Sequence, residues 1–377
     1  PAEAAASFPD DFRAGMRARA ARLGETDADL DAWDPGGLHD ARAHVLVMVH
    51  ARAAENADAG LEAARCDAAA HGLEVVHTQV MSALAVTSDA IPAWRRMEHF
   101  GFVDGVSQPA VEGALEPTVV EGNGTPVDGG WRAVRAGEFV LGHPDEEEAE
   151  PPLPRPDWLV RNGSYLVVRK LAQDVAGFRR LVAEQGRRHD LAPAEVAAKL
   201  VGRRADGTPL LPAARADAPR SQSDLNDVRY ENDRLGHACP VGSHVRRANP
   251  RDALDVSPAL VSRHRLLRRG MPYGPPLADG VTTDDGHERG LVFAAYCASI
   301  ERQFEFVQRE WLNDGNVFGA GHAPDPVVGH GDAPRRFVVT GPCPVFLGGL
   351  PRLVRPLGGE YLFQPGRRGI RGLADLD

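Results

Sequence analysis

Three short segments of this sequence hold side chains that could do chemistry together. Asp104 lies in Gly101-x-x-Asp104-Gly105, His244 begins His244-x-Arg-Arg, and Arg268 lies in Leu-Arg268-Arg-Gly. A carboxylate can accept and return a proton, and a neutral imidazole is a common protein ligand of iron. An arginine stays charged even in a site of low dielectric constant. What these groups can do depends on where the rest of the chain places them.

Each segment also has a purely structural interpretation. Asp-Gly pairs usually form tight turns, any one of fourteen histidines can be incidental, and arginines can protect a strand edge. For Asp104, the neighbours Phe100, Phe102 and Val103 favour chemistry. Apolar surroundings desolvate a carboxylate and raise its pKa toward a value useful for a general base. Arginines beside the histidine, such as Arg246, could pair with the carboxylates of a haem.

The apolar run at residues 290–298 predicts a buried strand. Its Leu291 and Phe293 are two positions apart, so on a strand they face the same side. They could line an apolar cavity.

The elements that must position these residues follow from the hydrophobic pattern. Alternating or continuous apolar runs predict strands, and 3/4 spacing predicts helices, with Phe304, Val307 and Trp311 on one helix face. The long Gly- and Pro-rich stretch at 101–161 is expected to be irregular, and 203–238 to be a surface linker. We read an α+β fold in two similar halves, each with a four-stranded sheet. Expected strands are 44–50, 73–79, 164–170, 263–267, 290–298, 336–340 and 360–363, and expected helices are 55–71, 174–185 and 300–312.

Composition limits the function classes. The 377 residues carry a formal net charge of −10, which disfavours nucleic acid as a partner. No apolar run is long enough for a membrane span. Residues 1–8 do not resemble a secretory signal, although a trimmed export signal stays open. The four cysteines are scattered without a C-x-x-C pair, so a reducing compartment, the cytoplasm, is the simpler expectation.

Taken together and in order, the segments resemble the dye-decolorising peroxidase family across roughly residues 95–365. The matching signatures are Gly101-x-x-Asp104-Gly105, His244-x-Arg-Arg, Leu-Arg268-Arg-Gly-x-Pro-Tyr-Gly274, and Leu291-Val-Phe293 continuing into 300–306. The resemblance implies two ferredoxin-like α+β domains with antiparallel sheets, and haem b held mainly by the C-terminal one. We place an N-terminal domain with the aspartate loop at 1–205 and a C-terminal domain at 206–377.

The resemblance also implies roles for single residues. His244 would be the proximal ligand of the haem iron, and Asp104 the distal acid and base. Arg268, rather than Arg265, would be the distal cation, because it fits the family's Leu-Arg-x-Gly pattern. Leu291 and Phe293 would wall the distal pocket.

The remaining cofactor contacts follow from the same resemblance and from chemistry. A second carboxylate is expected to accept from the other ring nitrogen of the proximal histidine and make it more basic. Asp325 is the expected partner, and Glu305 is its rival. Arg246 is expected to pair with a haem carboxylate.

The implied function is a hydrogen peroxide-dependent oxidation of dyes, phenols or other aromatic reductants through a ferryl intermediate. Electrons would arrive at the haem edge or through a surface aromatic residue, with Trp131, Trp158 and Tyr230 as candidates against simple packing. A homo-oligomer is compatible with the sequence. The alternative is a haem carrier or iron-release protein on the same fold, which would not need Asp104 together with Arg268. A hydrolase has no motif to support it.

Overall fold

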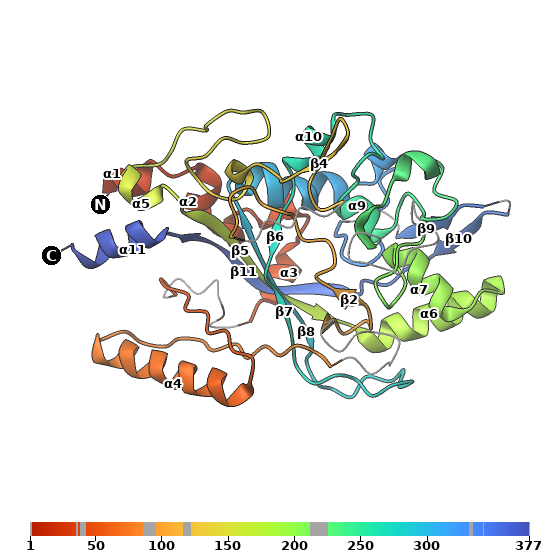
Figure 1. Cartoon of the computed structure of the whole chain (residues 1–377). Coiled ribbons are helices and arrows are strands. Elements are labelled where there is room, and N and C mark those ends of the chain that lie inside the picture. Colours follow the sequence, from red (N-terminus) through yellow and green to blue (C-terminus); the bar gives the residue numbers. More distant parts are fainter. Residues whose placement is uncertain are drawn as a thin grey trace.

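The central sheet forms from the apolar runs in the middle and the C-terminal part of the chain (Figure 1). The computed structural model describes residues 2–34, 37, 43–85, 96–115, 122–211, 225–331, 335–341 and 343–376. The antiparallel sheet has the order β11-β5-β8-β6, with β7 also pairing β8. Its strands are β5 (Ser164–Gln173), β6 (Leu267–Arg268), β7 (Met271–Tyr273), β8 (Gly290–Cys297) and β11 (Val354–Gln364).

The connections of this sheet are those of a ferredoxin-like unit. Along the chain, β5 is followed by helices, then by β6, β7 and β8, then by a helical segment, and last by β11. This β-α-β-β-α-β sequence confirms the expected α+β class with antiparallel strands. Strands from both predicted halves share the sheet, since β5 pairs with β8 and β11. The boundary placed between residues 205 and 206 stays a prediction.

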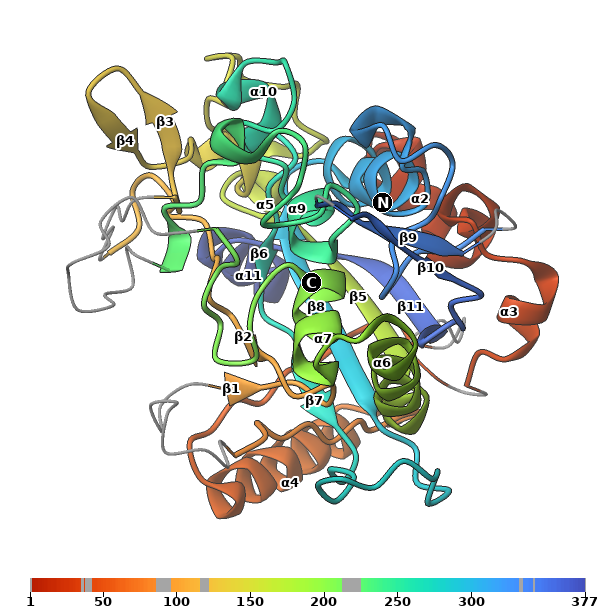
Figure 2. The same ribbon diagram turned by 90° about the vertical axis from the view of Figure 1, so that its right-hand side faces the viewer.

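Helices cover the sheet as the apolar spacing predicted. The segment after β8 forms two π-helical pieces, η4 (Ile300–Glu305) and η5 (Val307–Leu312), and Phe304, Val307 and Trp311 are all buried. After β5, the chain forms α6 (Val175–His189). Its N-terminus is capped by Asp174, whose side chain accepts from the amide of Gly177. Together with α7 (Pro193–Val201), α6 packs on the hairpin of β9 (Arg336–Val339) and β10 (Val345–Gly348) (Figure 2).

Three predicted strands are wrong. Residues 44–50 and 73–79 belong to no ladder, and Val45, Val47 and Val49 are exposed. The alternation is real, because Leu46 and Met48 pack on one face of the central sheet, but no neighbouring strand pairs with the segment. Between these runs, α4 (Ala54–Ala70) is the predicted helix and has no buried residue. Most of 263–267 is irregular, following α10 (Pro258–Ser262).

Shorter elements complete the described chain, and α11 lies beside α5 (Figure 1). No helix among the described residues is both long and apolar enough to cross a bilayer. The elements are α1 (Ala2–Ala6), α2 (Asp10–Ala18), η1 (Ala20–Leu23), α3 (Asp27–Asp31), β1 (Arg96–Met97), β2 (Val103–Asp104), β3 (Thr125–Val127), β4 (Gly130–Arg132), η2 (Ala136–Glu138), α5 (Asp157–Val160), η3 (Tyr230–Asp233), α9 (His244–Ala248), η6 (Asn316–Phe318) and α11 (Arg367–Ala374). The expected linker at 203–238 falls partly outside the described residues, which omit 212–224.

Candidate active site

His244 is the first residue of α9 and is held by a buried carboxylate. Its Nδ1 lies 3.1 Å from Oδ2 of Asp325, and an ionised carboxylate can only accept, so the ring nitrogen is the donor. The side chain of His244 is 29% exposed, while that of Asp325 is fully buried. With Nδ1 engaged in this way, Nε2 is the ring nitrogen that can bind a metal.

The carboxylate of Asp325 is satisfied on both oxygens. Its Oδ1 accepts from the amides of Val327 and Val328, both at 2.9 Å. Burial alone would raise the pKa of Asp325, but His244, the charge of Arg247 and the Val328 amide outweigh it, so the pKa lies below its usual value. The group is therefore a buried anion in fixed orientation beside the imidazole.

Glu305, the rival partner, is committed elsewhere. Both of its carboxylate oxygens accept from Arg19, at 2.5 Å each, and Oε1 also accepts from the hydroxyl of Tyr361. Of the two carboxylates considered from the sequence, Asp325 is the one beside His244.

Asp104 and Arg268 meet across two strands that are far apart in the chain. Nη1 of Arg268 donates to Oδ1 of Asp104 at 3.3 Å, and the amide of Gly105 donates to the same oxygen at 2.6 Å. Gly105 has a φ of 77°, a left-handed conformation that suits glycine. The backbone amide of Arg268 donates to Oε1 of Gln108 at 3.1 Å. Asp104 at the end of β2 thus contacts the side chain of Arg268, and Gln108 in the loop that follows contacts its backbone.

The expected apolar enclosure of Asp104 is not observed. Its side chain is 38% exposed, and that of Arg268 is 37% exposed. The reason is that the neighbouring apolar side chains point elsewhere: Phe102 packs with α6 and α7, and Val103 belongs to a separate cluster. The Asp-Gly turn that the structural interpretation favoured is present, and it presents the carboxylate at an accessible surface.

Arg268 shares a sheet face with the two predicted wall residues. It pairs with Ala295 of β8, and paired residues of an antiparallel ladder point to the same face, as do alternate residues along a strand. Leu291 and Phe293 therefore lie on the face of Arg268, and both are only partly buried, whereas Val292 on the opposite face is buried. The register thus puts Leu291, Phe293 and Arg268 on one face, where Phe293 also packs against Phe304. A role of the two apolar residues as a pocket wall stays a prediction.

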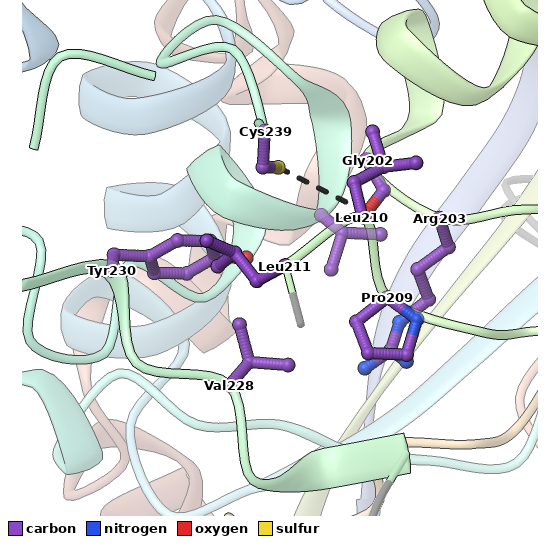
Figure 3. A pocket seen from close by; sticks show the side chains of 9 residues that line it. Gly202, Arg203, Pro209, Leu210, Leu211, Val228, Tyr230 and Cys239 are labelled. Carbon is purple, nitrogen blue, oxygen red and sulfur yellow. Dashed lines mark hydrogen bonds between the residues drawn. The ribbon is translucent and has the colours of Figure 1, made fainter. Parts of the chain in front are cut away.

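Arg203 is a buried cation whose Nη1 donates to the carbonyls of Gly207 and Leu225, both at 2.7 Å. Burial, together with the nearby charges of Arg251 and Arg268, lowers the pKa of Arg203. Figure 3 shows it lining a small cavity, which Val245, the residue after His244, also borders. The empty volume of about 180 Å³ includes open solvent and is below the roughly 300–1,000 Å³ of ligand pockets, so this cavity is too small for a haem. In both views, α9, β2 and β6 gather around β8 (Figures 1 and 2).

Arg265 is a second buried cation of this region, and sequence reasoning had set it aside. Burial and the charges of Arg251 and Arg268 lower its pKa. Within the described residues, Nη2 of Arg265 and Nη2 of Arg203 are buried without a hydrogen-bond partner. Buried cations without anions are unfavourable, so this part of the site is suited to a negatively charged group.

Arg246 is already paired within the protein, because its Nη1 lies 3.5 Å from Oδ2 of Asp233. It is buried and donates to the main-chain oxygens of Asp233 and Cys239, at 3.0 and 2.8 Å, and its guanidinium stacks over the ring of Tyr230. These contacts give no support to the predicted pairing of Arg246 with a haem carboxylate.

The three aromatic candidates for surface oxidation differ in exposure. Tyr230 is buried, so for it the packing interpretation holds. Trp131 is partly exposed near the guanidinium of Arg229, and Trp158 is exposed beside α11. A role in electron transfer stays a prediction for both tryptophans.

Comparison with known proteins gives the same family at the level of sequence. The family model described as Dyp-type peroxidase, C-terminal, matches residues 95–317. A dye-decolorizing peroxidase of Mycena epipterygia is 34% identical over 315 residues, covering 74% of this chain and 57% of the relative. The multifunctional dye peroxidase DyP2 of Amycolatopsis sp. is 34% identical over 308 residues, covering 74% and 61%. The chain thus spans less than two thirds of the length of these relatives.

Solved structures agree with the fold. An ancestral D-type dye decolorizing peroxidase superposes with a TM-score of 0.76 at 28% identity, covering 96% of this chain and 80% of that one. DyP2 from Amycolatopsis sp. superposes with a TM-score of 0.70 at 25% identity, covering 97% and 78%. The arrangement of the described elements is therefore that of these peroxidases.

Proposed function

The chain belongs to the Dyp-type peroxidase family, and from this premise we propose that it is a haem b peroxidase that uses hydrogen peroxide to oxidise dyes or other aromatic reductants. The observation that carries the proposal is the pairing of two different sites on one scaffold. One is a histidine oriented by a buried carboxylate, and the other is a partly exposed Asp104–Arg268 pair. A haem carrier needs the first site but not the second.

The residues present fit a haem. Nε2 of His244 would bind the iron, while Nδ1 is held by Asp325. Leu291 and Phe293 offer partly buried apolar surface to a porphyrin. The buried, unpartnered Nη2 atoms of Arg203 and Arg265 suit the two carboxylates of the porphyrin. When bound, the haem supplies an iron that takes up hydrogen peroxide and passes its oxidising equivalents to a reductant.

The protein's own contribution to peroxide cleavage is proton transfer and charge stabilisation. Oδ1 of Asp104 is occupied by Gly105 and Arg268, which leaves Oδ2 to take a proton from hydrogen peroxide and to return it to the departing oxygen. Such acid–base catalysis typically contributes about 10²–10⁴-fold. The guanidinium of Arg268 would stabilise the negative charge that develops on that oxygen.

On the other side, the chain controls the basicity of the iron ligand. Asp325 is a buried anion that accepts from Nδ1 of His244. A carboxylate in this position fixes the tautomer and makes the coordinating nitrogen a stronger donor.

A titration with haem, followed by one equivalent of hydrogen peroxide, tests the proposal. We expect a Soret band that changes rapidly on addition of peroxide and returns when a reducing dye is added. A Soret band that only bleaches would favour a haem carrier, and a chain that binds no haem would contradict the proposal.

A further inference from the structure

The second arginine of His244-x-Arg-Arg holds the chain segment that carries Asp325. Arg247 is 1% exposed, and its guanidinium donates to three main-chain oxygens. Nε donates to Trp311 at 2.6 Å, Nη1 to Ala323 at 2.9 Å and Nη2 to Leu312 at 3.2 Å. All three acceptors belong to the stretch from η5 to Asp325. One side chain of α9 therefore fixes both ends of that stretch.

The same stretch determines where the carboxylate of Asp325 lies. The amide of Asp325 donates to the carbonyl of Leu312 at 2.6 Å, the oxygen that also accepts from Arg247. A Cβ on Gly329 would lie 2.4 Å from the Asp325 nitrogen and 2.8 Å from the Leu312 oxygen, so only glycine permits this close approach. Arg247, Leu312 and Gly329 thus enclose the backbone of Asp325.

The contacts of Arg247 are those of a positioning residue. Its guanidinium donates to carbonyl oxygens and not to the carboxylate of Asp325. The ring of Phe318, from the same stretch, lies 5.7 Å from its guanidinium carbon. By contrast, the adjacent Arg246 donates to carbonyls at 233–239. The two neighbouring arginines thus hold two different segments, and only Arg247 holds the one that reaches His244.

We propose that Arg247 is a positioning residue that sets the carboxylate of Asp325 at hydrogen-bond distance from Nδ1 of His244. The inference rests on the proposed role of His244 as the iron ligand. Five donors in a rigid plane allow one arginine to hold three carbonyls at once, and a lysine cannot reproduce this geometry. Replacement by lysine keeps the charge but holds the segment from η5 to Asp325 less firmly. The carboxylate of Asp325 then moves relative to the imidazole of His244, and the imidazole becomes a weaker electron donor to the iron.

The test uses the full chain loaded with haem. It measures the strength of the bond between the iron and His244 rather than turnover. The stretching frequency of that bond is measured by resonance Raman in the ferrous protein, together with the reduction potential of the iron. We expect both R247K and D325N to lower the stretching frequency and to raise the reduction potential. The two shifts should be smaller in R247K than in D325N. The double variant R247K/D325N should match D325N alone, because the two residues act through one hydrogen bond.

A control variant separates this effect from the loss of any other arginine that donates to several main-chain oxygens. Arg179 also donates to three main-chain oxygens, those of Leu277, Ala278 and Val281, on a loop outside the site. R179K should leave both readings at their wild-type values.

Each outcome decides between the two proposals. A wild-type frequency in folded R247K, additive shifts in the double variant, or failure of R247K to fold would overturn the role of Arg247, since unfolding would show a general structural role. If H244A retains the iron–histidine stretching band, the proposed iron ligand is wrong, and the proposed function fails instead.

Discussion

The two sides of the candidate site are built in opposite ways. Asp325 is fully buried, and both of its oxygens are engaged by His244 and two backbone amides. The side chain of Asp104 is 38% exposed, and Nη1 of Arg268 donates to its Oδ1 at 3.3 Å. These surroundings fit the two proposed roles: the carboxylate proposed to keep one orientation is surrounded by donors, and the one proposed to take and release a proton is accessible. The same residue type thus occurs in two very different environments on one fold.

The largest expected effect is on the exposed side. Asp104→Asn keeps the size of the side chain but cannot carry the proton. We therefore expect the rate constant for reaction with hydrogen peroxide to fall by about 10²–10⁴-fold, measured by stopped-flow absorption. Haem binding should be unchanged. Asp128→Asn, in the exposed turn between β3 and β4, is the control, and an equal fall in that variant would contradict the role of Asp104.

On the buried side, the effect should appear in stability. Asp325→Ala leaves the amides of Val327 and Val328 and the ring of His244 without an acceptor. We expect the haem-free protein to lose about 3 kcal/mol of unfolding free energy, measured by urea denaturation.

An exposed counterpart makes this comparison sharper. Asp314 likewise accepts from the amide two residues ahead, Asn316, and from a histidine, His322, which is well exposed. Asp314→Ala should cost less than about 1 kcal/mol. Equal losses in the two variants would show that burial does not distinguish these pairs.

A third carboxylate, that of Glu138 at the end of η2, predicts a pH dependence. Glu138 is buried and accepts from Arg302 at 2.8 Å, and Arg302 and Arg263 both donate to Asp145. Burial, partly offset by the arginines, raises the pKa of Glu138 to about 7. The folded state then binds a proton that the unfolded state releases above about pH 4.5, so this group makes the protein less stable as the pH rises from 4.5 to 7.

Glu138→Gln removes that titration. Relative to wild type, the variant should gain on the order of 2 kcal/mol of unfolding free energy between pH 4.5 and pH 7. Urea denaturation at both pH values measures the difference. A constant difference would mean that Glu138 is ionised in the folded state throughout this range.

The smallest expected effect concerns Gln108, which accepts from the backbone amide of Arg268. Gln108→Ala removes one neutral hydrogen bond, worth about 1 kcal/mol, so we expect the peroxide reaction to slow by roughly fivefold. Stopped-flow absorption again provides the reading. A loss as large as that of Asp104→Asn would indicate that Gln108 itself acts on the peroxide.

The sequence predicted those parts of the structure that depend on local pattern. The strands at 164–170 and 290–298 and the buried face of 300–312 follow from apolar spacing alone, and all three are present. The run at 44–50 has the same kind of spacing but pairs with no strand, because a hydrophobic pattern shows that a face can be buried and does not provide a neighbour. Gln108 lies four residues after Asp104, and this spacing was the available signal.

Long-range partners were beyond the reach of the sequence. Glu305 resembled a partner for His244, but Arg19, 286 residues away, occupies it. The acidic residues at 145–150 lie in the stretch expected to be irregular, yet Asp145 is buried, and Arg263, 118 residues away, pairs with it. Charge pairs of this kind depend on the folded topology and not on local spacing.

The most direct test of the account compares His244→Ala with Asp104→Ala in a haem titration followed by hydrogen peroxide. We expect His244→Ala to lose tight haem binding, because the proposed iron ligand is gone, whereas Asp104→Ala should bind haem normally and react slowly with peroxide. Normal haem binding in His244→Ala, or an unchanged peroxide reaction in Asp104→Ala, would contradict the assignment of holding to one side and proton transfer to the other.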